Sequence, residues 1–231
     1  MNLYFLLEDS KSFFKVLPQW INFVLPNYNE VIKWESFEKN SNNFFVESGN
    51  GYPQIKKYLN ATLEKLYKND FPVDYIILCW DTDAKSDSTI MTEKNEYEQI
   101  FLQNVVACQY RLFPINRCFE TWLLGNRAAY PQEINEQFAP YNDFFNVTTN
   151  DPEEMLEPGN QCERVSRYHY RYLQEMLRGQ ANYSKKNPGF VATNNYFNEL
   201  QSRITDTDDL RSFAKFIKFL TDCRASGYFP C

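Results

Sequence analysis

An apolar stretch that runs directly into two aspartates is the feature that most constrains this chain. The segment VDYIILCWDTDA, residues 73–84, has the composition of a buried strand and ends in Asp81 and Asp83. Side chains two residues apart on extended backbone point to the same face, so this spacing predicts that the two carboxylates converge. Two close carboxylates repel unless a cation lies between them, and hard divalent cations prefer oxygen ligands. The pattern therefore predicts a metal pocket at the end of a strand.

A second apolar run has the same kind of ending. Residues 3–7 are apolar and are followed by Glu8 and Asp9. Ligands of open α/β sheets bind beyond the carboxyl ends of the strands, so Glu8, Asp81 and Asp83 would share one acidic pocket if the two strands are neighbours. Such a pocket suits Mg²⁺ or Mn²⁺. The alternative, which the spacing leaves open, is that these acids only cap the helices or turns that follow the strands.

The expected elements alternate between strands and helices through the first half of the chain. This alternation predicts an α/β fold in which a parallel or mixed sheet carries helices on both faces, followed by a helical C-terminal part. Strands are expected at residues 2–8, 74–80 and 111–115, with two further strands or a hairpin at 30–37 and 43–47. Helices are expected from Ser10 or Ser12, from Pro53 to Tyr67, over residues 93–108, from residue 118, and over most of 161–223.

Composition narrows the class of protein. The 231 residues include 20 Phe, 16 Tyr and 4 Trp, which is enough for a large apolar core. No apolar run approaches the ~20 residues that a membrane span needs, and the N-terminus lacks the pattern of a signal peptide. The 6 cysteines form no CxxC pair, which favours reduced thiols over a disulfide framework or a zinc site. We therefore expect a cytoplasmic protein without a membrane segment.

Charge is distributed unevenly along the chain. Residues 128–163 contain eight acidic residues, four prolines and no Lys or Arg, whereas Arg164 to the end contains 11 basic and 6 acidic residues. The basic part suits a polyanionic partner, although a solvated helical surface explains the same charges. We expect three parts, namely a catalytic core over residues 1–127, an acidic irregular insertion over 128–160 and a basic helical region over 161–231.

Two further segments contain candidate site residues. Glu120 stands among core-forming residues in CFETWLLGN, so it is either solvated on the outer face of a helix or directed into a site. The string RVSRYHYRYL places Arg164, Arg167 and Arg171 among tyrosines. Such a string can contact phosphates and stack on bases, but an aromatic helix face against the core needs the same spacing. We expect core positions for the tyrosines, leave the arginines open, and expect His169 to be packed or exposed and not part of a site.

Three motifs together resemble a known family. The segments LYFLLED, CWDTDA and RCFETWLL are similar to those of small Toprim-domain proteins, in particular the RloB-like and OLD-type Toprim nucleases of bacterial defence loci. The resemblance covers residues 2–125 and, more loosely, the tail. It implies that Glu8, Asp81 and Asp83 hold Mg²⁺, and that Glu120 is the acid of the third motif and a fourth catalytic candidate. In the tail, Lys185 and Lys186 correspond to phosphate contacts.

The chain departs from this family at one position, where Asp9 replaces the glycine that usually follows the first glutamate. A side chain there would alter the metal geometry or add a ligand.

The resemblance implies a Mg²⁺- or Mn²⁺-dependent nuclease that acts on DNA or RNA as an anti-phage effector. An effector of this kind would be toxic if it were always active, so a partner such as an ATPase sensor would hold it inactive. The chain itself has no Walker A loop, so ATP hydrolysis would come from that partner. The acidic segment would then serve for docking or autoinhibition. Two alternatives stay open: a glycosyltransferase whose DxD binds Mn²⁺ and a nucleotide sugar, and a non-catalytic Toprim-like subunit. The expected nucleic-acid contacts are Lys185, Lys186, Arg164, Arg167 and Arg171.

Overall fold

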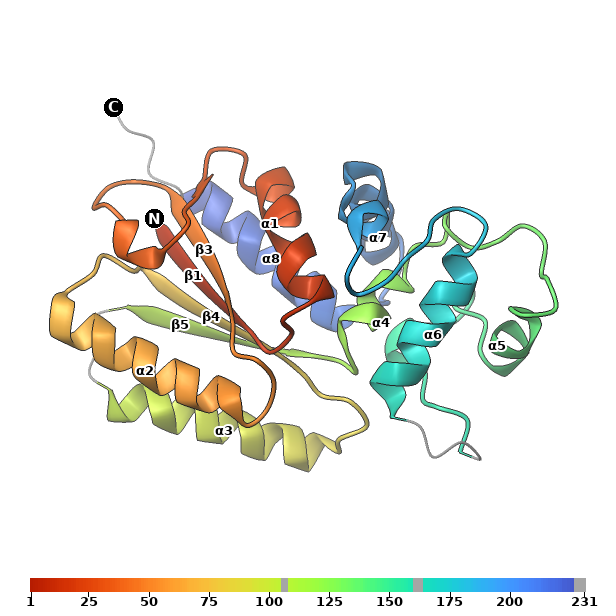
Figure 1. Cartoon of the computed structure of the whole chain (residues 1–231), viewed down its shortest axis with the longest axis horizontal. Helices are drawn as coiled ribbons and strands as arrows, with labels where there is room; N and C mark the ends of the chain where they lie inside the picture. Colours follow the sequence, from red (N-terminus) through yellow and green to blue (C-terminus); the bar gives the residue numbers. More distant parts are fainter. Residues whose placement is uncertain (105–107, 160–163, 227–231) are drawn as a thin grey trace. The chain divides into compact units, whose positions relative to one another are not determined.

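Five strands form one sheet in the computed structural model, which describes residues 1–104, 108–159 and 164–226 (Figure 1). The strand order is β2-β3-β1-β4-β5. The central strand β1 (Asn2–Leu7) pairs in parallel with β3 (Asn43–Ser48) on one side and β4 (Tyr75–Asp81) on the other. The short β2 (Asn29–Glu30) pairs in parallel with β3, and β5 (Gln109–Ile115) forms the opposite edge. The predicted α/β class is therefore confirmed.

The chain divides into two units. The first, called the sheet unit, comprises residues 1–80, 85–114 and 218 onward, and the second, called the helical unit, comprises residues 81–84 and 115–217. Asp81 and Ile115, the last residues of β4 and β5, are thus counted with the helical unit. The boundaries predicted after residues 127 and 160 both lie inside the helical unit.

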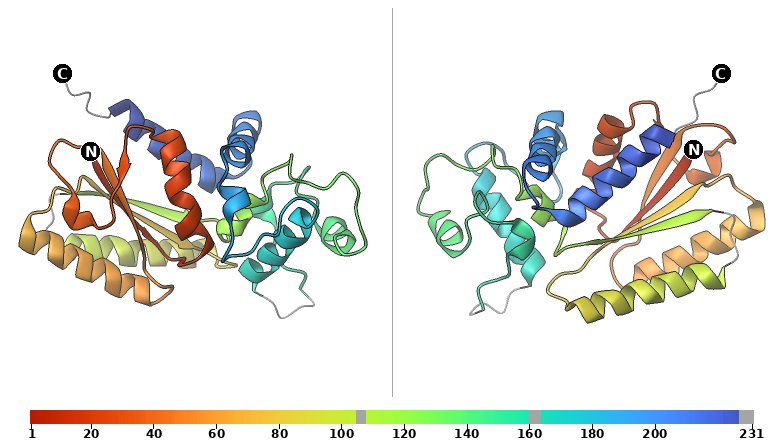
Figure 2. Two further views of the ribbon diagram at one scale, coloured as in Figure 1. Left: turned by 45° about the horizontal axis from the view of Figure 1, so that its top comes forward. Right: turned by 180° about the vertical axis from the view of Figure 1, so that it is seen from behind.

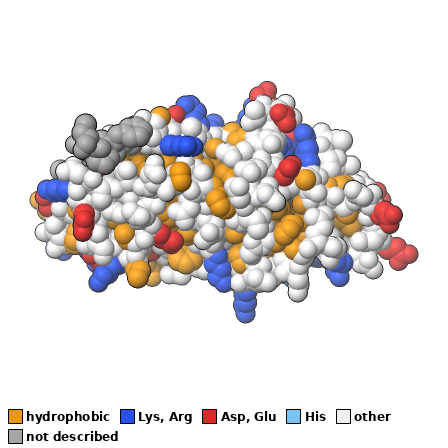
Figure 3. Space-filling model, turned by 90° about the horizontal axis from the view of Figure 1, so that it is seen from above, with side chains coloured by type: hydrophobic (Ala, Val, Ile, Leu, Met, Phe, Trp, Pro, Cys, Tyr) orange, Lys and Arg blue, Asp and Glu red, His pale blue; other side chains and the backbone are white. Residues whose placement is uncertain are grey.

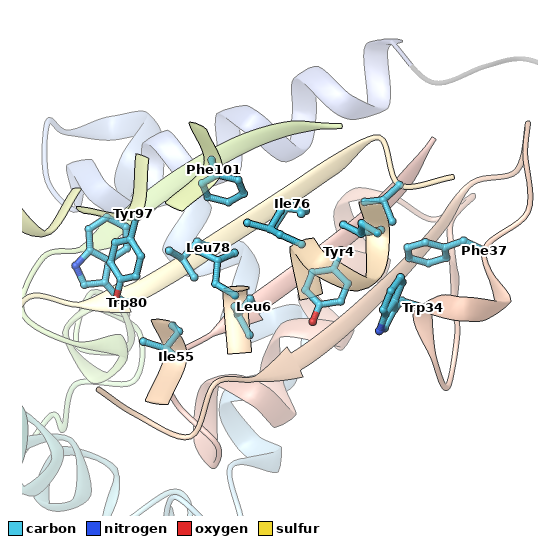
Figure 4. Packing of buried hydrophobic residues seen from close by; sticks show 14 residues of the cluster. Tyr4, Leu6, Trp34, Phe37, Ile55, Ile76, Leu78, Trp80, Tyr97 and Phe101 are labelled. Atoms are coloured by element: carbon cyan, nitrogen blue, oxygen red, sulfur yellow. The ribbon is translucent and has the colours of Figure 1, made fainter. Parts of the chain in front are cut away.

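One face of the sheet packs against α2 (Gln54–Asn69) and α3 (Asp87–Gln103). Alternate residues of β1 and β4 point to this face, as the two-residue repeat of a strand requires. On α2 the buried residues recur at helical spacing, so that one stripe of the helix faces the sheet. The resulting cluster contains Tyr4, Leu6, Ile76, Leu78 and Trp80 from the strands and Ile55, Leu59, Leu63, Leu66, Tyr97 and Phe101 from the helices (Figure 4).

The other face is covered by α1 (Ser12–Val24) and by the part of α8 (Arg211–Ser226) that belongs to the sheet unit (Figure 2). Phe219 of α8 packs at 5.5 Å between ring centroids against both Tyr75 and Phe113. Because both faces are covered, all six residues of β1 are buried. Continuous burial of this kind is typical of parallel strands and explains the uninterrupted apolar runs in the sequence.

Two predictions about local structure are wrong. Residues 30–37 contribute only Glu30 to a strand, and β2 and β3 are parallel, so they form no hairpin. The rest of that segment contains a 3-10 helix, η1 (Trp34–Ser36), whose Trp34 ring packs edge-on against Phe71 at 4.8 Å. Its aromatic composition reflects this packing and not a strand.

The start of α3 also differs from the prediction. The helix begins at Asp87 and not near residue 93, because the Ser86 hydroxyl accepts a hydrogen bond from the Thr89 amide and caps it. The predicted end at residue 108 also differs, since α3 ends at Gln103; residues 105–107 of the predicted helix lie outside the described residues.

The helical unit contains α4 (Phe119–Leu123), α5 (Ala139–Phe144), α6 (Val165–Leu177), α7 (Asn194–Asp206) and the start of α8, with 3-10 turns η2 (Pro152–Glu154) and η3 (Gly189–Ala192). In the described ranges, no helix is both long enough and apolar enough to cross a membrane.

A buried arginine connects the acidic segment to α7. The Arg203 guanidinium is 2% exposed and donates hydrogen bonds to the carbonyl oxygens of Val147 at 2.7 Å and Asn150 at 2.8 Å. It also pairs with Asp209 at 2.8 Å, which compensates its buried charge. This part of the acidic segment has little regular structure, as expected, but its backbone is fixed by specific contacts.

The burial of β4 leads to a matched stability prediction. Ile76→Ala removes a side chain that is 0% exposed, whereas Ile32→Ala makes the same change at a position that is 97% exposed. We expect the first to lower the free energy of unfolding by about 2–5 kcal/mol and the second by less than about 0.5 kcal/mol. Denaturant unfolding of both variants measures this difference, and equal losses would contradict the described burial.

Candidate functional site

The strands that carry the predicted acids are neighbours in the sheet unit. Leu7 of β1 lies opposite Cys79 of β4, and the Glu8 amide donates a hydrogen bond to the Cys79 carbonyl at 2.9 Å. The Glu8 carbonyl in turn accepts from the Gly51 amide at 2.9 Å. Glu8 is half-buried and directly follows the end of its strand. The condition on which the predicted acidic pocket rested, that the two strands pair, is therefore confirmed.

Asp9 has a structural role at the start of α1. Its carboxylate accepts hydrogen bonds from the amides of Lys11 at 3.0 Å and Phe13 at 2.6 Å, and from the Ser12 hydroxyl at 3.3 Å. These contacts satisfy amides that a helix start leaves unpaired, and a negative charge is favourable there. Asp9 therefore caps the start of α1. The cap accounts for an aspartate at the position where the resembled family has glycine.

The chain leaves the extended conformation directly after Asp81. Asp81 is the last residue of β4, but Asp83 lies in a turn with a left-handed φ of 49°. The argument that placed both aspartates on extended backbone is therefore wrong at Asp83. A left-handed φ is tolerated by Asp and Asn better than by most other residues, so residue type and turn agree at this position.

Backbone hydrogen bonds clamp this turn within the helical unit. The Thr82 amide donates to the Ile115 carbonyl at 3.1 Å, and the Asp83 amide donates to the Arg117 carbonyl at 2.7 Å. In the other direction, the Arg117 amide donates to the Thr82 hydroxyl at 3.0 Å. Arg117 itself has a left-handed φ of 67°. We call this arrangement of residues 81–84 and 115–117 the strand-end clamp.

Two polar atoms of the strand-end clamp are buried without a partner. Oδ1 of Asp83 and Nε of Arg117 form no hydrogen bond with any of the described residues. Burying such atoms unpaired costs free energy, so a bound water, an ion or a catalytic role is needed to account for them. Arg117 was not among the sequence candidates. Its position directly before the CFETWLL motif is the signal that could have suggested it.

Glu120 and Lys185, predicted separately, meet each other. Glu120 on α4 is 1% exposed, and its Oε1 lies 3.0 Å from the Lys185 ammonium. The Lys185 ammonium also lies 5.4 Å from the centre of the Tyr170 ring. A solvated Glu120 is therefore excluded, and its carboxylate holds the lysine that was predicted to contact phosphate. Glu120 is thus a residue that positions Lys185.

The pKa of the Cys118 thiol depends on the charged groups around it. Burial raises its pKa well above the usual value, and the carboxylates of Glu120 and Asp81 raise the pKa further. Both carboxylates therefore act on one point within the helical unit. The Lys185 ammonium beside Glu120 acts in the opposite direction and lowers this pKa.

His169 is a core residue that contacts Thr121, the neighbour of Glu120. Its Nε2–H donates to the Met155 carbonyl at 3.1 Å, and its Nδ1 accepts from the Thr121 hydroxyl at 2.8 Å. The ring is 0% exposed, and burial lowers the pKa of His169 to about 3. It is neutral at physiological pH and is packed, as predicted.

The basic residues of α6 are exposed, whereas two of its tyrosines are core residues. Tyr168 is 3% exposed and Tyr172 is 0% exposed, which confirms the prediction for them; Tyr170 is half-buried. The predicted basic contacts are all exposed, namely Arg164 directly before α6, Arg167 and Arg171 on it, and Lys186 in the loop before η3. On the face of the molecule in Figure 3, basic side chains stand singly or in small groups among acidic ones.

The described residues contain no caged metal site. Among the described residues, no three His, Cys, Asp or Glu side chains are arranged to hold a metal. Glu8 belongs to the sheet unit, while Asp81, Asp83 and Glu120 belong to the helical unit. Mg²⁺ commonly uses one or two carboxylates together with water and substrate phosphates. Asp83, whose buried Oδ1 has no partner among the described residues, is the carboxylate here that suits such an ion.

Comparisons of this chain with family models, with curated proteins and with solved structures find no match. The resemblance to Toprim proteins therefore rests on the three motifs and is carried forward as a proposal.

The ion pair of Glu120 and Lys185 leads to a prediction on stability. We expect Lys185→Met to lower the free energy of unfolding by about 1–3 kcal/mol, because it removes the cation beside a buried carboxylate. Lys186→Met, the same change at the exposed neighbouring residue, should have almost no effect. Adding Glu120→Gln to Lys185→Met should recover part of the loss, and an additive double variant would contradict the pairing.

The buried His169 leads to a prediction on pH. Its pKa is depressed when folded, so the unfolded chain binds a proton more readily and the contribution of His169 is complete above pH 6.5. As the pH falls from 6.5 towards 3, this contribution is lost, on the order of 2 kcal/mol by pH 5. Denaturant unfolding at pH 7 and pH 5 should therefore show a larger loss for the wild type than for His169→Gln. Equal losses would contradict a neutral buried ring.

Proposed function

We propose that this protein is a Mg²⁺-dependent nuclease that cleaves phosphodiester bonds of nucleic acids, with Asp81 and Asp83 as metal ligands. The single observation that carries the proposal is the buried, unpartnered Oδ1 of Asp83, held by the strand-end clamp directly after β4. A carboxylate oxygen in that state is poorly stabilised by the protein alone, and a divalent cation would satisfy it. Mn²⁺ would substitute for Mg²⁺ in such an oxygen site.

Glu8 is the remaining acid proposed for metal binding. It follows β1, which pairs directly with β4, and the resemblance assigns it to the metal. Its backbone is fixed by hydrogen bonds to Cys79 and Gly51. Asp9 is not proposed as a ligand, because its carboxylate caps α1.

When bound, Mg²⁺ would supply an activated water and neutralise charge on the phosphate. The residues of the chain would hold and orient the substrate. Arg117 is proposed to neutralise a phosphate oxygen, because its guanidinium has a buried Nε–H without a partner and adjoins Asp83. Lys185, held by Glu120, would contact the same backbone from a fixed position.

The exposed cations of α6 are proposed to extend this contact along the polymer. Arg164, Arg167 and Arg171 recur at intervals of three and four residues, which places them on one side of a helix. Lys186 would add to them. Contacts of this kind release counterions, so binding should weaken steeply as salt rises. The proposal covers both DNA and RNA as the polymer. Control by an ATPase partner in phage defence rests on the resemblance alone.

The proposal predicts that Asp83→Asn abolishes cleavage without unfolding the protein. Asparagine keeps the left-handed turn but removes the charge that binds the cation. We expect at least about a hundredfold loss of cleavage of mixed DNA or total RNA in Mg²⁺, with a Tm within a few degrees of the wild type. Glu8→Gln and Asp81→Asn should behave in the same way.

The matched control is Asp206→Asn, an exposed aspartate at the end of α7 that should leave cleavage unchanged. Retained cleavage in Asp83→Asn would refute the assignment of the metal ligands. Hydrolysis of a nucleotide sugar with no cleavage of either polymer would replace the proposal with the glycosyltransferase alternative. Failure of the wild type to bind Mn²⁺ would favour the non-catalytic alternative.

A further inference from the structure

A cavity of about 530 Å³ lies within the helical unit, away from the residues proposed for catalysis. Its volume is within the range of small-molecule sites, roughly 300–1,000 Å³. Asn126 and Gln180 line it from two loops, Phe190 from η3, and Asn195, Asn198 and Glu199 from α7. None of the sequence motifs predicted this cavity.

The wall formed by α7 carries polar groups that the protein does not use. Asn195, Asn198 and Glu199 follow one another at intervals of three and one along the helix, so they lie on one side of it. They are exposed and make no side-chain hydrogen bond or ion pair with the rest of the described chain. Asn126, in contrast, is 3% exposed and occupied, since it accepts from the Ala129 amide at 2.9 Å. The Asn126 side of the cavity is therefore fixed by an internal hydrogen bond, whereas the α7 side has polar groups available to a ligand.

The charge of the lining selects among ligands. Its residues include no Lys and no Arg, and Glu199 is its charged side chain. Arg127, next to lining residues in sequence, is directed to Asp209 at 3.3 Å. A phosphate or a carboxylate would find no cation here, whereas a neutral group that donates hydrogen bonds would find the Glu199 carboxylate and amide oxygens.

An aromatic ring gives the cavity an apolar surface. Phe190 is 36% exposed while it lines the cavity, and its ring packs edge-on against Tyr196 at 5.6 Å. Tyr196 is itself fixed, because its hydroxyl donates to the Leu123 carbonyl at 2.7 Å. The ring of Phe190 is thus supported from within and available from the cavity. A flat ligand that is apolar on its faces and polar at its edge matches this combination.

We propose that this cavity binds a single nucleobase that carries an exocyclic amino group, namely guanine, adenine or cytosine. Proteins recognise unstacked bases by stacking them on aromatic rings and by hydrogen bonds to their polar edge. Carboxylates accept from base amino groups, and amides pair with the remaining edge atoms. The base would belong to the polymer that is cleaved, and this part of the proposal rests on the proposed nuclease function. Recognition of the base itself does not.

The test uses uncharged nucleosides with the full-length protein and no metal. Calorimetric titration with guanosine and inosine compares two ligands that differ only in the exocyclic amino group, and cytidine and uridine form a second comparison. We expect guanosine and cytidine to bind about tenfold or more tightly than inosine and uridine. Glu199→Gln should reduce this preference, and Phe190→Ala should weaken all four.

Matched controls exist in the same unit. Phe144→Ala changes another partly exposed phenylalanine, 42% exposed, and Glu136→Gln another exposed glutamate. Both should leave binding unchanged. Equal binding of guanosine and inosine, no nucleoside binding at millimolar concentration, or binding of a neutral disaccharide in place of nucleosides would each overturn the proposal. Because these titrations involve no cleavage, a failed nuclease assay and a failed base site give separate results.

Discussion

The candidate site depends on the strand-end clamp. Without the hydrogen bonds from Thr82 to Ile115 and from Asp83 to Arg117, the chain after β4 would have no reason to turn sharply at Asp83. The clamp imposes a left-handed conformation on both Asp83 and Arg117, and non-glycine residues adopt it at a cost. Strain and an unsatisfied carboxylate oxygen thus occur at one place. Proteins retain such combinations chiefly at functional positions.

The motif around Glu120 combines structure with function. Its apolar residues are buried, and Thr121 is bonded to the neutral His169. Glu120 faces Lys185 instead of solvent. An aliphatic residue in place of Glu120 would pack but would not hold an ammonium group at a defined point. The role of the buried carboxylate is therefore to fix a cation, and the core beneath it keeps that arrangement rigid.

The central strands of the sheet were predicted well because strands buried on both faces have continuous apolar runs in the sequence. β1, β4 and the helix after Pro53 all lie where their patterns placed them. The prediction failed where contacts between residues distant in sequence determine the local structure. Trp34 forms a 3-10 turn because it packs on Phe71, and Asp83 leaves the extended backbone because residues 115–117 hold it. Neither partner can be inferred from local composition.

The same limit applies to the site. The strand-end position of Glu8 and Asp81 was predictable from parallel pairing, whereas the pairing of Glu120 with Lys185 and the contacts of Arg117 with Thr82 and Asp83 were not. Asp9 shows how a cap can resemble a ligand in sequence.

The central claim is that Asp83 binds a divalent cation, and Mn²⁺ binding followed by electron paramagnetic resonance tests it most directly. The account predicts one weakly bound Mn²⁺ in the wild type, retained in Glu120→Gln and lost in Asp83→Asn. Equal binding by the wild type and Asp83→Asn would contradict it.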